Sequence, residues 1–213
     1  YNYGSFLMGD GTTKLVPTTE LGFLDGNMFI ISCQYDQSQV TANSTSIPVT
    51  LLSTPLWIDP KGNEGLNSQK TEPTNPLYSL DKQQSSLEYY DKNTIVLTMP
   101  FWGKVTNSSV EDSEVKKHSF VLSYDREAIK DTDTKLKLYI SHVVDDAGET
   151  VTRSNFTYAY RAYSIREALT AFSNKTGKLP KYLELTAQTN NSKDELKEEN
   201  GETSVEYDYA FTE

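Results

Sequence analysis

The sequence predicts an all-β protein, and two observations carry that prediction. Apolar and polar side chains alternate with a period of two in segment after segment, which is the pattern of half-buried strands. Glycine, aspartate and asparagine separate these segments, and such residues favour tight turns. With 213 residues, the chain is long enough for one large β domain or two smaller ones.

Residues 1–58 are predicted to form a small unit of short strands. A hairpin is expected at Gly9-Asp10-Gly11, because glycine reaches positive φ without steric cost. Further strands are expected at 28–35 and 46–53, and the first of them is entered through an Asp25-Gly26 turn. The second is rich in β-branched residues, which favour strands.

Residues 59–76 are rich in proline, glycine and asparagine and show no periodicity, so they are predicted to be a linker. Residues 77–213 are then predicted to form a larger β unit. In this unit a strand at 94–100 leads into Phe101-Trp102-Gly103. The charged segment 107–117 is expected to be an exposed loop between strands.

The later strands are predicted from side chains that share one face of a pleated strand. These faces are made by Leu136, Leu138 and Ile140, by Phe156, Tyr158, Tyr160 and Ala162, by Leu183, Leu185 and Ala187, and by Val205, Tyr207, Tyr209 and Phe211. The turn at 145–148 predicts that the first two of these strands form a hairpin. The charged segment 190–203 is expected to be a long loop.

One helix is predicted, over 165–173, covering one end of a sheet. Ser164 and Glu167 have the spacing of a capping box, in which the two side chains satisfy free amides at a helix start. Ala168, Leu169, Ala171 and Phe172 would form the body of the helix, and Asn174 to Gly177 would end it.

The hairpin Leu7-Met8-Gly9-Asp10-Gly11-Thr12-Thr13-Lys14-Leu15-Val16-Pro17 resembles the opening of NigD-like proteins, and the order of elements is similar over nearly the whole chain. The resemblance implies an N-terminal OB-like barrel at 1–58 and a C-terminal antiparallel β-sandwich at 77–213. It also implies a lipoprotein of the bacterial cell envelope, associated with the outer membrane and either periplasmic or surface-exposed. The family's biochemical role is unassigned, and its name comes from a bacteriocin-associated gene cluster, which suggests an immunity role.

The sequence departs from the family by lacking the lipobox cysteine. It opens in what reads as the middle of a strand, so a leader is expected to have been removed, and a lipid anchor follows from the resemblance alone. The apolar stretches are far shorter than the roughly 20 residues of a membrane helix. The lone Cys33 is expected to be a small buried hydrophobe.

The charge of the chain argues against nucleic acid as a partner. A formal net charge of −10 and a pI of about 4.8 repel phosphate backbones, whose binding depends on lysine and arginine. A zinc site is poorly supported, because His118 has no second ligand at a suitable spacing. His142 continues the inward face of its strand and is expected to be a hydrogen-bonded histidine at the edge of the core.

Carboxylates are numerous, and a facing pair in a cleft would suit a glycosidase. The conspicuous acidic groups lie in predicted turns, however, where aspartate serves turn chemistry. Asp131-Thr132-Asp133 offers oxygen ligands for calcium but lacks the glycine and distal glutamate of an EF-hand loop. We therefore expect no catalytic residues, no bound metal and no cofactor.

Aromatic side chains near predicted strand ends are the candidate ligand contacts, since β-sandwiches bind sugars by ring stacking. They are Trp57, Tyr89, Tyr90, Phe101 and Trp102. The alternative is that these rings belong to the core or cover a sheet. The sequence therefore predicts a non-enzymatic envelope binding module whose partner is a protein or a glycan. A glycan-active or accessory protein and a bacteriocin immunity protein are the alternatives.

Overall fold

The fold is seen in a computed structural model that describes residues 4–21, 24, 28–58, 66–106, 108–148, 150–197 and 201–211. The chain divides into two compact units, residues 1–60 and 61–213. Both units are built mainly of strands, and the helices are short, so the all-β prediction is confirmed. No helix in the described part of the chain is long and apolar enough to cross a membrane.

The first unit contains short strands only. They are β1 (Phe6–Leu7), β2 (Lys14–Pro17), β3 (Phe29–Ile30), β4 (Cys33–Gln34), β5 (Ser46–Leu51) and β6 (Leu56–Trp57), with a 3-10 turn at Gln37–Gln39. The sheet order is β1-β2-β5-β4, with a separate β3-β6 pair. The predicted hairpin is present between β1 and β2, where the Asp10 carboxylate accepts hydrogen bonds from the amides of Thr12 and Thr13.

The described strands of this unit do not close into the expected OB-like barrel. The edge strands β1 and β4 have two residues each, which leaves few backbone groups with which to close a barrel. In addition, β2 pairs with β5 in parallel, so the sheet is mixed. The expected turn at Asp25-Gly26 lies outside the described residues.

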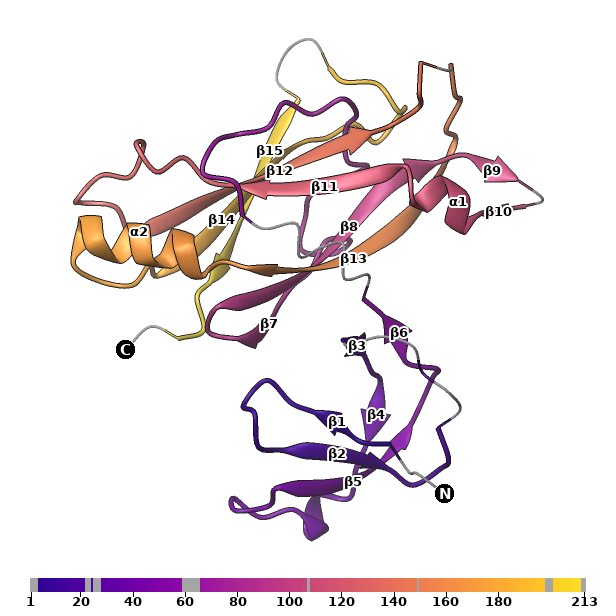
Figure 1. The fold of residues 1–213 in the computed structure, drawn as a ribbon, viewed down its shortest axis with the longest axis vertical. Coiled ribbons are helices and arrows are strands. Elements are labelled where there is room, and N and C mark those ends of the chain that lie inside the picture. Colours follow the sequence, from indigo (N-terminus) through magenta and orange to yellow (C-terminus); the bar gives the residue numbers. More distant parts are fainter. Residues whose placement is uncertain are drawn as a thin grey trace. The chain divides into compact units, whose positions relative to one another are not determined.

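The second unit is a sandwich of two sheets (Figure 1). The strands are β7 (Leu87–Asp91), β8 (Thr94–Gly103), β9 (Val105–Thr106), β10 (Ser109–Val110), β11 (His118–Ser123), β12 (Lys135–Val144), β13 (Asn155–Ser164), β14 (Tyr182–Gln188) and β15 (Glu202–Asp208). The helices are α1 (Asp112–Val115) and α2 (Arg166–Thr176). One sheet has the order β11-β12-β14-β15 and the other β13-β8-β7, while β9 and β10 form a separate hairpin.

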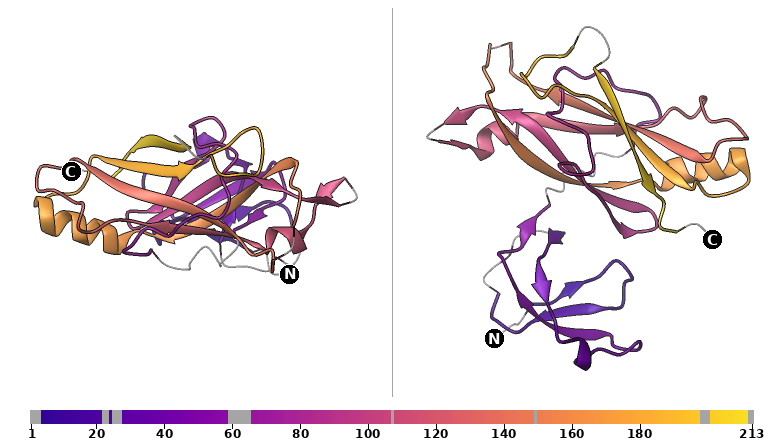
Figure 2. Two further views of the ribbon diagram at one scale, coloured as in Figure 1. Left: turned by 90° about the horizontal axis from the view of Figure 1, so that it is seen from above. Right: turned by 180° about the vertical axis from the view of Figure 1, so that it is seen from behind.

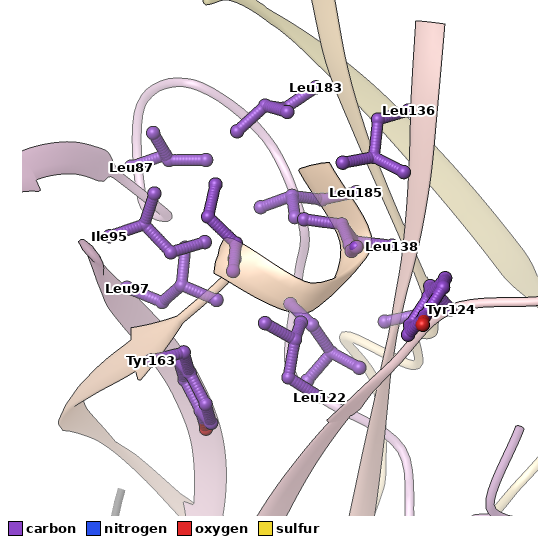
Figure 3. Packing of buried hydrophobic residues seen from close by; sticks show 14 of the residues in the cluster. Leu87, Ile95, Leu97, Leu122, Tyr124, Leu136, Leu138, Tyr163, Leu183 and Leu185 are labelled. Atoms are coloured by element: carbon purple, nitrogen blue, oxygen red, sulfur yellow. The ribbon is translucent and has the colours of Figure 1, made fainter. Parts of the chain in front are cut away.

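The core lies between the two sheets. Figure 3 shows Leu87, Ile95, Leu97 and Tyr163 of the three-stranded sheet facing the leucines of the four-stranded sheet. Leucines 136, 138, 183 and 185 are buried, as the alternation predicted. Helix α2 adds Ala168, Leu169, Ala171 and Phe172 to this core. It lies at one end of the unit, as the views in Figure 2 also show.

The predicted hairpin between the strands before and after residues 145–148 is wrong. Strand β12 pairs with β11 in antiparallel fashion and with β14 in parallel, whereas β13 pairs with β8 in the other sheet. The turn therefore carries the chain from one sheet to the other. The parallel pair corrects the prediction of a purely antiparallel sandwich, and it is reached by a crossover through β13 and α2.

The helix α2 is confirmed, but its predicted capping box is not. Ser164 is the last residue of β13, where it pairs with Thr94, and the cap residue is Ile165, which provides no side-chain hydrogen bond. Glu167 instead accepts a hydrogen bond from the Tyr124 hydroxyl at 3.3 Å. The helix ends as predicted at Gly177, whose φ of 74° is the left-handed conformation that glycine favours.

Two segments that were expected to lack structure contain ordered contacts. The segment 107–117 includes β10 and α1, and its Glu114 is buried. In the described part of the expected linker, 66–76, the Asn67 amide donates to Leu122 and the Thr74 amide donates to His142. The linker residues 59–65 lie outside the described ranges.

Candidate functional site

The candidate site is built on β13, which is the edge strand of the β13-β8-β7 sheet. Antiparallel pairing with β8 places Phe156 opposite Trp102, Tyr158 opposite Pro100 and Tyr160 opposite Thr98. Residues opposite each other lie on the same face of a sheet. These side chains alternate with Ala159, Arg161 and Tyr163, which are buried. Phe156, Tyr158 and Tyr160 are therefore on the outer face of the sandwich.

The backbone of these same residues points to the open edge of the sheet. The Pro100 carbonyl accepts from the Tyr78 amide, and the Thr98 amide donates to Ser86, so both β8 residues direct their backbone groups away from β13. In an antiparallel ladder the residues opposite such positions also point away from their neighbour. The N–H and C=O groups of Tyr158 and Tyr160 thus face outward. The Tyr160 carbonyl accepts a hydrogen bond from Arg161 at 3.0 Å.

Four aromatic rings gather on the outer face beside this edge, and we call them the β13 aromatic surface: Tyr78, Trp102, Phe156 and Tyr158. The Tyr78 ring stacks on Phe156 with centroids 4.6 Å apart and meets Trp102 edge-on at 4.9 Å. Phe156 and Tyr158 are 45% and 39% exposed, although large apolar side chains are usually buried. Trp102 is 9% exposed, and its Nε1 donates to the Asn190 carbonyl.

The structure separates the five predicted ligand contacts, and only Trp102 belongs to the β13 aromatic surface. Phe101 points the other way and is buried in the core. Tyr89 and Tyr90 lie on β7, where Tyr90 is exposed and the Tyr89 hydroxyl donates to the Asp208 carbonyl at 2.9 Å. Trp57 is in the first unit, and its side chain lies outside the described part.

Sequence reasoning missed the other members of this surface. Phe156 and Tyr158 were grouped as one face of a strand, which is correct, but that face is the outer one. Tyr78 follows the predicted linker and belongs to no predicted strand. No local signal identified the outer face, because Thr157 and Arg161 alternate with the aromatic residues and this pattern predicts that the aromatic side faces inward.

Beneath Phe101 the two histidines of the chain form a buried pair. His118 Nδ1 and His142 Nε2 are 2.8 Å apart, and the His142 Nδ1 is 2.9 Å from the Pro76 carbonyl. Because a carbonyl only accepts, we assign the His142 proton to Nδ1, and His118 then donates from its own Nδ1. Burial lowers the pKa of His118 to about 4 and of His142 to about 3. The expected hydrogen-bonded His142 is therefore confirmed, and its partner was not foreseen.

A buried ion network continues from His118. Glu114 Oε1 lies 3.2 Å from His118 Nε2 and accepts from Arg153 Nε at 2.7 Å. Burial acts to raise the pKa of Glu114, but hydrogen bonds from the Lys104 amide and Arg153 help to lower it overall. Arg153 also pairs with Asp146 at 2.5 Å and with Asp194 at 3.3 Å.

The polar groups of this network form hydrogen bonds and ion pairs with one another. Burial raises the pKa of Asp194, while hydrogen bonds from Arg153 lower the pKa of Asp146. The Asp194 carboxylate also accepts a hydrogen bond from the Asn75 side chain at 3.0 Å. No group of three metal-ligating side chains occurs among the described residues. We interpret the network as a structural one, whose ion pairs and hydrogen bonds connect α1, the sheet of β11 and β12, and the segment around Asp194.

A glycosidase would need two facing carboxylates in a cleft. Asp125 and Asp133 share a cavity of about 270 Å³ with lysine side chains. Each of them holds a turn, since Asp125 accepts from the amides of Glu127 and Ala128 and Asp133 accepts from the amide of Lys130. The two aspartates of this cavity are therefore occupied by backbone amides of their turns. A catalytic pair would need carboxylates that are free to contact a substrate.

No protein-family model matches the chain, and neither does any curated protein. Among solved structures, a candidate lipoprotein from Bacteroides fragilis is similar over 96% of this chain and 91% of its own, with 28% identity and a TM-score of 0.72. A protein of unknown function from Bacteroides vulgatus matches 99% of this chain and 85% of its own, with 8% identity and a TM-score of 0.54.

An uncharacterised protein from Parabacteroides merdae matches 93% of this chain and 90% of its own, with 13% identity and a TM-score of 0.53. At such low identity, this structure and the one from Bacteroides vulgatus show a shared fold and nothing about function. The chain is thus similar along its whole length to a lipoprotein-like protein of Bacteroides, and none of the three descriptions mentions an enzymatic activity.

Proposed function

We propose that this all-β chain is the ectodomain of a cell-envelope lipoprotein that acts as a non-enzymatic binding module. In our proposal an extended segment of a protein partner pairs with the open edge of β13. The likeness to the Bacteroides fragilis candidate lipoprotein supports the envelope assignment. The binding role is supported by one observation: among the described residues no strand pairs with the outer edge of β13, and its outer face carries exposed aromatic rings.

Edge strands of soluble proteins are commonly protected by charges, proline or bulges. Strand β13 has ten residues, contains no proline, and pairs with β8 in continuous register. Its one charged side chain, Arg161, is largely buried and donates one hydrogen bond to the outward Tyr160 carbonyl, while no hydrogen bond of a described residue to the outward groups of Tyr158 is found. Added strands gain main-chain hydrogen bonds from such an edge and gain specificity from side-chain contacts.

The aromatic rings supply apolar area for the same partner. Covering the exposed parts of Phe156 and Tyr158 would contribute about 2 kcal/mol each, at about 25 cal/mol per Å². Aromatic residues are also enriched in protein interfaces. One face of Phe156 is stacked on Tyr78, which leaves the other face for a partner. Main-chain pairing with the edge of β13 requires a polypeptide, and this requirement favours a protein partner over a glycan.

The proposed module could serve bacteriocin immunity or envelope assembly, and these two roles differ in which protein supplies the added strand. A photo-crosslinking residue at Phe156, introduced in living cells, tests the proposal and identifies that protein. The matched control places the crosslinker at Lys137, an exposed position on β12 in the other sheet. We expect one protein to be crosslinked from position 156 and not from position 137.

Two substitutions at Tyr158 then separate backbone pairing from ring contacts. Tyr158→Pro removes an N–H that points to the open edge and no hydrogen bond to β8, whereas Tyr158→Val keeps that N–H and removes the ring. We expect Tyr158→Pro to abolish the crosslink and Tyr158→Val to weaken it. The proposal fails if the folded Tyr158→Pro protein crosslinks as well as the parent, or if position 156 yields no protein.

A further inference from the structure

Helix α2 lies at one end of the second unit (Figure 1). Three cavities of about 500, 540 and 600 Å³ lie beside it. The first and second share Arg166, Thr170 and Asn174 as lining residues, and the second and third share Leu179 and Tyr209. Because neighbouring cavities share lining residues, they lie side by side around α2, and we call the three together the α2 groove.

The α2 groove concentrates positive charge in an acidic protein. Its described lining residues include five cations, namely Lys92, Arg126, Arg166, Lys178 and Lys181. They include two carboxylates, those of Glu167 and Asp208. The whole chain carries a formal net charge of −10, so the excess of positive charge in the groove is opposite in sign to the average charge of the surface.

Two of these cations are without a protein partner in the part of the chain that the structure describes. Neither the guanidinium of Arg126 nor that of Arg166 makes a hydrogen bond or an ion pair with a described residue, whereas Arg153 pairs with three carboxylates. Arg166 also occupies the first turn of α2, where the helix dipole disfavours a cation. Both arginines are exposed, so their guanidinium groups are accessible to an anionic ligand.

Apolar and hydroxyl groups complete the groove. Leu179 and Phe211 are exposed, and Tyr209 lies between the second and third cavities. The Phe211 ring contacts Tyr209 and also Tyr89, with centroids 5.7 and 5.5 Å apart, so the aromatic wall is backed by β7. Flat apolar surfaces next to cations and polar side chains suit a chain of sugar rings that carry acidic groups.

We propose that the α2 groove binds an anionic polysaccharide. Arg126 and Arg166 bind its carboxylate or sulfate groups through bidentate hydrogen bonds, while Leu179 and Phe211 cover the apolar faces of its sugar rings. Three cavities in series fit a chain of several residues rather than a single small anion. This site is separate from the open edge of β13, and it does not depend on the protein partner proposed there.

Binding of the whole chain to polygalacturonate, chondroitin sulfate and neutral dextran, measured by calorimetry at about 50 and 150 mM salt, tests this inference. The first two polymers distinguish carboxylate from sulfate as the recognised group. We expect binding to at least one of them and none to dextran. Absence of binding to both anionic polymers at the lower salt concentration overturns the proposal.

The double variant Arg126→Gln/Arg166→Gln should bind at least about tenfold more weakly. Its thermal midpoint should not fall, because neither arginine has a described partner to lose. The control variant Lys104→Gln/Lys116→Gln removes the same charge from exposed positions of the second unit that do not line the groove, and it should bind within about twofold of the parent. Equal weakening in both variants, or equally tight binding of single-stranded DNA, would show that only net charge matters and would refute the proposal.

Discussion

Acidification is expected to destabilise the second unit through its two buried histidines. In the folded chain, burial lowers the pKa of His118 from 6.5 to about 4 and that of His142 from 6.5 to about 3. Between these values and 6.5 the unfolded chain binds protons that the folded chain does not. The free energy of unfolding must therefore fall as the pH falls below 6.5, and this loss levels off below the folded pKa values.

Each histidine contributes up to about 1.4 kcal/mol per pH unit, so the pair should lower the free energy of unfolding by about 2 kcal/mol between pH 6 and pH 5. Hydrogen bonds that lower the pKa of Glu114 and Asp146 add a further loss at lower pH. Burial raises the pKa of Asp194, so the folded chain binds a proton there at a higher pH than the unfolded chain does. This group therefore raises the free energy of unfolding as the pH falls. The interval from pH 6 to pH 5 lies between the folded and unfolded pKa values of both histidines, so both contribute to the loss there.

Urea unfolding at pH 7, 6 and 5, followed by tryptophan fluorescence, measures this effect. A Trp57→Phe background leaves Trp102 as the one tryptophan, so the signal comes from the second unit. In that background His118→Gln should halve the pH dependence, to about 1 kcal/mol over the same interval.

A free energy of unfolding that stays constant or rises from pH 7 to pH 5 would refute the reasoning. It would mean that His118 carries protons on both nitrogens in the fold, with Nε2 donating to Glu114 across the 3.2 Å contact.

Three further predictions concern stability and are checked by the same urea unfolding at pH 7. Glu114→Ala leaves the buried Arg153 with fewer partners and should cost about 3–5 kcal/mol, and a cost below about 1 kcal/mol would contradict a structural role for the network. Phe172→Ala removes a fully buried ring of α2 and should also cost about 3–5 kcal/mol. Gly103→Ala brings a Cβ within 2.8 Å of the Val110 side chain and should cost about 1–3 kcal/mol, much of which Val110→Ala should restore.

The strands could be predicted from the sequence because their signal is local. Leu136 and Leu138, like Leu183 and Leu185, alternate with polar residues and are buried as that pattern requires. Strand pairing has no such local signal. The residues 145–148 have the composition of a hairpin turn, yet they carry the chain into the other sheet, where β13 meets β8. A turn sequence specifies a change of chain direction. The packing of the whole unit decides which strands pair.

The candidate site was missed for a related reason. Alternating aromatic residues on β13 suggested a core face, but Tyr163 and the aliphatic part of Arg161 fill that place, and the Arg161 guanidinium lies over the Phe120 ring at 5.5 Å. The histidine pair is also invisible in the sequence, since 24 residues separate its members. Only the register that sets Phe120 opposite His142 brings them together.

Amide hydrogen exchange along β13, in the free chain and in the complex with the crosslinked partner, tests the proposed strand pairing most directly. In the free chain the outward amides of Phe156, Tyr158 and Tyr160 should exchange quickly, and those of Thr157 and Ala159, which face β8, should exchange slowly. We predict that saturation with the partner slows the three outward amides to the rates of their neighbours. Outward amides that still exchange quickly in the saturated complex would contradict strand addition at this edge.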